Sequence, residues 1–223
     1  IRRFTLDKKS AVTSLINHND FCLQKNSEMA SLGLEARKPS LLLHACCGPC
    51  STSCVERLAD EYQITLYYYN PNITDREEYF LRRENLIKFI DAFNKENAEK
   101  GIFVDFLDGR YDPERFLSLT EKLNDEPEGG KRCDVCFAMR LSDTAVVAGK
   151  LGMDYFTTVM SVSPHKNYEK IAELGFELEK SVNADFLDID FKKKNGFGRS
   201  VELSKKYGLY RQNFCGCDYA RQL

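Results

Sequence analysis

The residues of this chain best suited to chemistry are its cysteines, because seven of the nine fall into three short groups. The groups are Cys46, Cys47 and Cys50, then Cys133 and Cys136, then Cys215 and Cys217. Thiolate is the form of cysteine that binds metals and reacts, and clustered thiols in a reducing compartment indicate metal or redox chemistry more often than structural disulfides. The sequence therefore predicts a metal site built from these seven residues.

The first group follows an apolar run, in the stretch Leu-Leu-Leu-His-Ala-Cys-Cys-Gly-Pro-Cys-Ser that begins at Leu41. The run has the character of a short buried strand. Gly48 and Pro49 indicate a turn, and Ser51 or Thr52 is suited to begin a helix. The thiols are thus expected at the N-terminus of a helix, where the helix dipole favours anions and lowers a thiol pKa.

The spacing within the groups limits how they share metals. Adjacent Cys46 and Cys47 point in opposite directions in an extended chain, which suits two centres, or two irons of one cluster if the backbone turns at Gly48. Cys133 and Cys136 share one helix face, and the glycine between Cys215 and Cys217 allows a tight wrap of the backbone. A zinc site or an iron–sulfur cluster takes four such ligands, which leaves about three thiols for a second metal or a redox pair.

Two other functions compete with an iron–sulfur enzyme. The segment Cys47-Gly48-Pro49-Cys50 matches the active-site tetrapeptide of thioredoxin-like disulfide reductases, but that function leaves Cys46 and the four distal cysteines unused. A zinc-stabilised RNA-binding protein would explain the cysteines but not their surplus over four.

The segments around the cysteines alternate between strand and helix patterns. Strands are predicted at 41–45, 64–69, 102–107, 155–160 and 184–189, and helices at 51–61, 74–100, 112–123, 132–151, 168–180 and 199–207. This order predicts an α/β fold whose mostly parallel sheet carries helices on both faces. Ligands of such sheets bind beyond the carboxyl ends of the strands, where the first cysteine group lies.

Length and composition favour one domain in a chain of 223 residues. We expect residues 1–38 to be an N-terminal extension and residues 39–223 to be the catalytic α/β domain with the metal cluster. The net charge of −2 shows that the chain as a whole is not a polycation, so any binding of nucleic acid must use a local basic patch. The clearest candidate for such a patch is the group Lys192, Lys193, Lys194 and Arg199. With no membrane-length apolar run and no secretory signal, the expected location is the cytoplasm.

Several motifs together resemble the small cobalamin-independent epoxyqueuosine reductases, in order over about residues 39–219. The motifs are His44-x-Cys46-Cys47-x-Pro49, Tyr68-Tyr69-Asn70-Pro71-Asn72-Ile73, Arg132-Cys133-x-x-Cys136, Thr157-Thr158-Val159-x-Ser161-x-Ser163-Pro164-His165-Lys166-Asn167 and Gly208-Leu209-Tyr210-Arg211-Gln212-Asn213-x-Cys215-Gly216-Cys217. The resemblance implies a Rossmann-like domain of the adenine-nucleotide α-hydrolase type. It also implies reduction of the epoxide of epoxyqueuosine to queuosine at the wobble position of tRNA, with electrons from an external donor.

The resemblance also implies roles for the cysteines. Ligands of a [4Fe–4S] cluster are implied at Cys46, Cys47, Cys133 and Cys136. Cys215 and Cys217 correspond to a catalytic pair that is interpreted as a redox-active disulfide. A second interpretation adds a mononuclear iron beside the cluster, and the Cys46–Cys50 group and the distal pair then divide their thiolates between the two centres.

Overall fold

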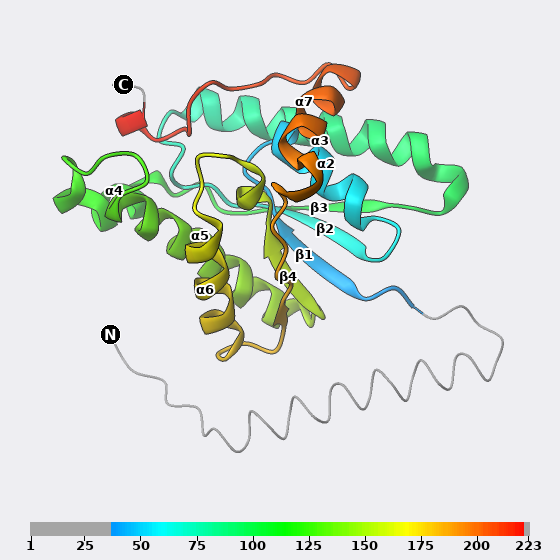
Figure 1. The fold of residues 1–223 in the computed structure, drawn as a ribbon, viewed down its shortest axis with the longest axis horizontal. Helices are drawn as coiled ribbons and strands as arrows, with labels where there is room; N and C mark the ends of the chain where they lie inside the picture. The colour runs from blue at the N-terminus through cyan, green and yellow to red at the C-terminus, as the bar shows by residue number, and fades with distance from the viewer. Residues whose placement is uncertain (1–36, 221–223) are drawn as a thin grey trace. The chain divides into compact units, whose positions relative to one another are not determined.

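The computed structural model describes residues 37–220 of the chain. The predicted N-terminal extension, residues 1–38, lies almost wholly outside this part and stays a prediction, as does the division of the chain that it implies. In the described part, five strands form one sheet in the order β3-β2-β1-β4-β5, and every pairing is parallel (Figure 1).

The elements alternate along the chain much as predicted. The strands are β1 (Ser40–His44), β2 (Gln63–Tyr68), β3 (Val104–Asp108), β4 (Tyr155–Thr158) and β5 (Asp185–Phe186). The α-helices are α2 (Gly48–Leu58), α3 (Arg76–Asn97), α4 (Pro113–Thr120), α5 (Lys131–Leu151), α6 (Tyr168–Glu179) and α7 (Gly196–Lys206). Short 3₁₀ helices are η1 (Ala98–Lys100), η2 (Glu121–Leu123), η3 (Val159–Val162), η4 (Lys193–Asn195) and η5 (Asp218–Ala220).

Strand β1 lies at the centre of the sheet because both of its faces are apolar. Leu41 and Leu43 pack with α2 and α3 on one face, whereas Leu42 packs with α5 and α6 on the other. Successive side chains of a strand point to opposite faces, so a run of leucines suits a strand covered on both sides. In Figure 1 the helices α2, α3 and α7 lie on one side of the sheet, and α5 and α6 lie on the other.

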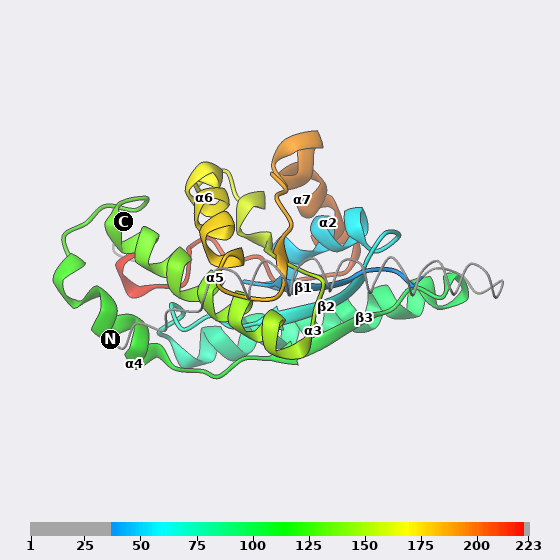
Figure 2. The ribbon, with the colours of Figure 1, turned by 90° about the horizontal axis from the view of Figure 1, so that it is seen from below.

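The strand order places a topological switch point at β1. From β1 the chain moves outward to β2 and β3, then returns to form β4 on the other side of β1. Figure 2 shows β1, β2 and β3 following one another in this order. The order 3-2-1-4-5 is that of a doubly wound Rossmann-like sheet, in which ligands bind at the carboxyl ends of the strands beside the switch point. The predicted α/β class, with a parallel sheet covered on both faces, is confirmed.

Three elements differ from the prediction in their bounds, and the first of them affects the cysteines. Helix α2 begins at Gly48 instead of Ser51, so Cys47 is its N-cap and Cys50 lies in its first turn. Proline suits the first turn of a helix because the N–H that it lacks would have no partner there. Strand β4 ends at Thr158, where η3 begins, and β5 is only two residues long.

Candidate metal centre

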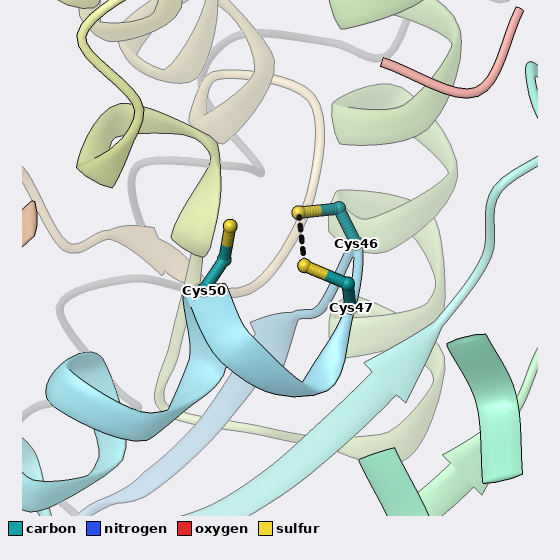
Figure 3. Close-up of side chains that lie close together, drawn as sticks. All are labelled: Cys46, Cys47 and Cys50. Carbon is teal, nitrogen blue, oxygen red and sulfur yellow. Dashed lines mark hydrogen bonds between the residues drawn. The ribbon is translucent and has the colours of Figure 1, made fainter. Parts of the chain in front are cut away.

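Three sulfur atoms meet where β1 ends and α2 begins. The Sγ atoms of Cys46, Cys47 and Cys50 all lie within 4.8 Å of one another, and those of Cys46 and Cys47 are 3.8 Å apart (Figure 3). Of the two arrangements predicted for Cys46 and Cys47, the structure has the one in which the backbone turns at Gly48, and the two thiols do not point in opposite directions. The backbone enters the helix at Gly48, which brings both thiols to one side. We call these three residues the thiol triad.

The electrostatics of the thiol triad favour one thiolate. Hydrogen bonds from the thiols of Cys46 and Cys50 hold the pKa of Cys47 well below its ordinary value, although burial opposes the charge. The Gln212 amide also donates to Cys47 Sγ, at 3.0 Å. The same contacts raise the pKa values of Cys46 and Cys50. Once one thiol of the triad is ionised, its negative charge opposes ionisation of the other two. All three can therefore be thiolates only with a cation bound among them.

The second cysteine pair lies in the first turns of α5. Cys136 is buried, and its Sγ accepts a hydrogen bond from Arg140 NH1 at 3.6 Å. Burial raises the pKa of Cys136, while the Arg140 charge favours its thiolate. Cys133 Sγ is half-buried and accepts from the backbone N–H of Gly129 at 3.2 Å.

The third pair lies in the chain after α7, and its two thiols have different surroundings. Cys215 Sγ accepts a hydrogen bond from Lys166 Nζ at 2.8 Å. Burial opposes the Lys166 charge, yet the neighbouring Cys215 and Cys136 raise the pKa of Lys166. Cys217 is 9% exposed and packs in a small cluster with Phe116, Cys136 and Met139.

A buried arginine fixes the backbone of the third pair. Arg82 on α3 is 2% exposed, forms a 2.6 Å ion pair with Glu78, and donates to the carbonyl oxygens of Phe214 and Cys215 at 3.2 and 3.1 Å. Gly216 has φ +107°, and a Cβ there would lie 2.9 Å from Ile73 and 3.1 Å from the Arg82 guanidinium. Glycine is needed at this position because of both the backbone conformation and the close approach.

The structure brings the predicted site residues together to different degrees. Cys46, Cys47 and Cys50 form one group, and Arg140 interacts electrostatically with one cysteine from each group: Cys136, Cys46 and Cys215. Cys217 meets the second pair at Cys136. No described contact joins Cys133 to the thiol triad. The ligand and catalytic roles assigned to the seven cysteines remain predictions.

Two neighbouring residues support the triad without joining it. His44 is fully buried, with Nδ1 2.9 Å from Thr158 Oγ1 and Nε2 3.1 Å from the Tyr69 carbonyl oxygen. Burial lowers its pKa to about 3, with a further contribution from Arg140, so the ring is neutral. Cys54 is a core thiol that donates to the Cys50 carbonyl at 3.3 Å.

Four further residues of the site were not predicted to contact the cysteines: Arg82, Arg140, Lys166 and Gln212. They come from α3, α5, the loop before α6 and the segment after α7, and each contacts a cysteine or its backbone. Lys166 and Gln212 lie within motifs of the family resemblance, and Arg140 lies four residues after Cys136 on one helix and inside an apolar stretch.

No helix in the part of the chain that the structure describes combines the length and the hydropathy of a membrane span.

Comparisons with known proteins agree with the motifs. Residues 41–222 match the family model described as "Epoxyqueuosine reductase QueH". A protein of that name from Streptococcus pyogenes serotype M1 is 43% identical over 189 residues, which covers 85% of this chain and 73% of the relative. Another from Haemophilus influenzae is 36% identical, covering 81% and 71%, and one from Thermotoga maritima is 32% identical, covering 81% and 90%.

Among solved structures, the U34-tRNA thiolase NcsA from Methanococcus maripaludis with its [4Fe-4S] cluster covers 93% of this chain and 68% of its own. Its identity is 16% and its TM-score is 0.46, a likeness too small to carry an argument about this chain. The sequence matches are far stronger and span nearly all of the described residues. The chain belongs to the epoxyqueuosine reductase QueH family.

Proposed function

We propose that this protein reduces the epoxide of epoxyqueuosine in tRNA to give queuosine. The observation that carries the proposal is the thiol triad, with Cys47 buried and Cys46 and Cys50 half-buried, at the switch point of the sheet in a chain of the epoxyqueuosine reductase family. The net reaction takes two electrons and two protons, breaks both C–O bonds of the epoxide, forms an alkene and releases the oxygen as water.

The donor set fits an iron–sulfur centre. Three sulfur atoms within 4.8 Å of one another suit thiophilic metals, and Fe–S clusters are held by cysteine thiolates. In this proposal Cys46, Cys47, Cys133 and Cys136 hold a [4Fe–4S] cluster. Cys50, Cys215 and Cys217 remain for an additional mononuclear iron, or the last two form a redox pair.

Bound there, the iron–sulfur centre would pass electrons one at a time from an external donor. The protein itself supplies charge and protons around the thiolates. Arg140 and Lys166 place two positive charges beside Cys136 and Cys215, where negative charge accumulates during reduction. Lys166 holds a proton at Nζ 2.8 Å from Cys215 Sγ, at the edge of the site.

The direct test is conversion of the modified base. Anaerobic protein, a low-potential electron donor and tRNA that carries epoxyqueuosine are combined, and the tRNA is digested for mass spectrometry of its nucleosides. We expect queuosine, which differs from the substrate by the loss of one oxygen atom. Binding of tRNA without conversion would favour the zinc-stabilised RNA-binding protein, and reduction of a protein disulfide alone would favour the thioredoxin-like enzyme.

The tRNA contact that we propose uses only part of the basic run predicted from sequence. Lys193 and Lys194 line a pocket with Arg57 of α2, about 10 Å along that helix from Cys50. Lys192 instead donates to the Lys166 carbonyl oxygen at 2.9 Å. Arg199 is held by Glu56 and Glu202. The basic residues of this pocket that remain to contact phosphate are therefore Lys193, Lys194 and Arg57.

Replacing Lys193 and Lys194 by alanine is expected to weaken tRNA binding. Each lysine that neutralises a phosphate contributes about 1 to the slope of log affinity against log salt, so the double variant should lose about 2. Binding is measured at several salt concentrations. Lys95→Ala with Lys150→Ala, which removes two exposed lysines from the last turns of α3 and α5, is the matched control. Equal slopes in both double variants would exclude this pocket as the contact.

A further inference from the structure

Arg140 is the most deeply buried large charged side chain in the described part of the protein. It is 1% exposed, although a guanidinium cannot lose its charge at ordinary pH. Its three nitrogens each face one partner. NH1 donates to Cys136 Sγ at 3.6 Å, NH2 donates to Asn70 Oδ1 at 2.9 Å, and Nε lies 3.4 Å from His44 Nε2.

None of these partners is a carboxylate. Within residues 37–220, Arg140 has no ion pair with an aspartate or glutamate, unlike buried Arg82, which pairs with Glu78. His44 is neutral and Asn70 is uncharged. A buried charge is costly unless an opposite charge offsets it. The remaining partner able to carry negative charge is sulfur, and the cysteines with which Arg140 interacts come from all three groups.

The contacts of Arg140 also join two separate parts of the site. Asn70, which accepts from Arg140, donates to the Ala45 carbonyl oxygen at 2.9 Å, immediately before Cys46. His44 lies at the end of β1, and Cys136 lies one turn before Arg140 on α5. The guanidinium thus connects the end of β1, which carries the thiol triad, to the helix that carries the second cysteine pair.

We propose that Arg140 is a positioning residue of the metal centre: it holds Cys136 against the end of β1 and supplies the positive charge that offsets the cysteine thiolates. The inference rests on the iron–sulfur centre of the proposed function. The reduction potential of an iron–sulfur cluster depends on net charge and on hydrogen bonds to sulfur. Arg140 therefore raises the potential of the centre and makes electron uptake from the donor easier.

Two variants test the charge in different ways. Arg140→Gln removes it. Asn70→Asp leaves the arginine in place and gives it a carboxylate partner of nearly the same shape as the amide, which neutralises the charge but also removes the donor to the Ala45 carbonyl oxygen. In both we expect the midpoint potential of the reconstituted centre to fall by about 59 mV or more, a tenfold change for one electron. Arg140→Gln should also weaken iron binding about 10- to 100-fold, as loss of an outer-shell contact does.

Two further variants separate charge from general damage. Arg140→Lys keeps the charge and is expected to bring the potential back towards the wild-type value. Arg132→Gln removes another buried guanidinium of α5, which donates to the carbonyl oxygens of Leu123, Asn124 and Glu126 and has no sulfur among these partners. It should lower the melting temperature but change the potential less than Arg140→Gln does, because none of these hydrogen bonds reaches sulfur.

The outcomes are distinguishable from failure of the proposed function. If the wild-type protein holds no iron–sulfur centre, the proposed function itself is wrong. If the wild type holds one and Asn70→Asp shows an unchanged potential, Arg140 does not supply its counter-charge. Should Arg140→Gln fail to fold, Asn70→Asp and Arg140→Lys still decide between these results, because both keep a cation at position 140.

Discussion

Replacement of Cys47 by alanine is expected to remove the iron of the protein and its activity together. Cys47 is the N-cap of α2, its sulfur lies 3.8 Å from that of Cys46, and it receives the hydrogen bond of Gln212. It is also the thiol of the triad that ionises first, because hydrogen bonds from Cys46 and Cys50 lower its pKa. Since loss of an outer-shell contact alone costs about 10- to 100-fold in metal affinity, loss of this ligand should cost more.

The same helix provides a matched control. Cys54 lies on α2 seven residues after Cys47, is fully buried, and donates to the Cys50 carbonyl oxygen. Cys54→Ala should keep its iron and sulfide while losing about 1 kcal/mol of stability, as is common for a core substitution. Iron, acid-labile sulfide and the visible absorption are measured on both variants after anaerobic reconstitution. Equal metal content in Cys47→Ala and the wild type would show that the triad is not a metal site.

The second large effect is expected from Cys215→Ser and Cys217→Ser. We expect both variants to lose iron as well as turnover, because the surroundings of both thiols are those expected of metal ligands. Cys215 faces Lys166, and Cys217 packs beside Cys136. A disulfide across a single glycine would close a very small ring, and departure from relaxed disulfide geometry stores strain.

The measurement is again iron and sulfide content, here combined with thiol trapping of the oxidised protein. A redox pair would give a different pattern: wild-type metal in both serine variants, no turnover, and a trapped Cys215–Cys217 disulfide in the oxidised wild type. That pattern would overturn the ligand assignment. It would leave the thiol triad, Cys133 and Cys136 as the remaining sources of iron ligands.

The fold could be predicted because its signals are local. Apolar runs marked the strands, and the leucines of β1 identified a strand buried on both faces. The start of α2 was placed three residues late, because Gly48 and Pro49 are turn residues in most contexts and only the cap geometry shows that they open a helix. The edge strand β5 was predicted too long, since Leu187 and Ile189 continue its apolar alternation but lie beyond the two residues that pair with β4.

The site was predicted only as far as the cysteines themselves. Their types and spacing indicated a metal, and the family resemblance implied one cluster held by Cys136 and the cysteines after β1, but no pattern predicted the side chains that connect them. That connection passes through Arg140 and Asn70, which lie 70 residues apart. The sequence does not show whether an arginine is buried. The buried Arg82 and Arg140 could therefore not be distinguished from Arg83, whose ion pair with Asp108 is partly exposed. Only the tertiary structure shows that the charges of Arg82 and Arg140 belong to the site.

The most direct test of the metal assignment is the metal and sulfide content of the wild-type protein purified without oxygen. The account predicts about four irons per chain with a similar amount of acid-labile sulfide, and a further iron if a mononuclear site is also filled. Iron–sulfur absorption should disappear when the centre is removed by a chelator under oxidising conditions. Zinc at about one per chain, with neither iron nor sulfide, would contradict the redox function and indicate a zinc-stabilised protein instead.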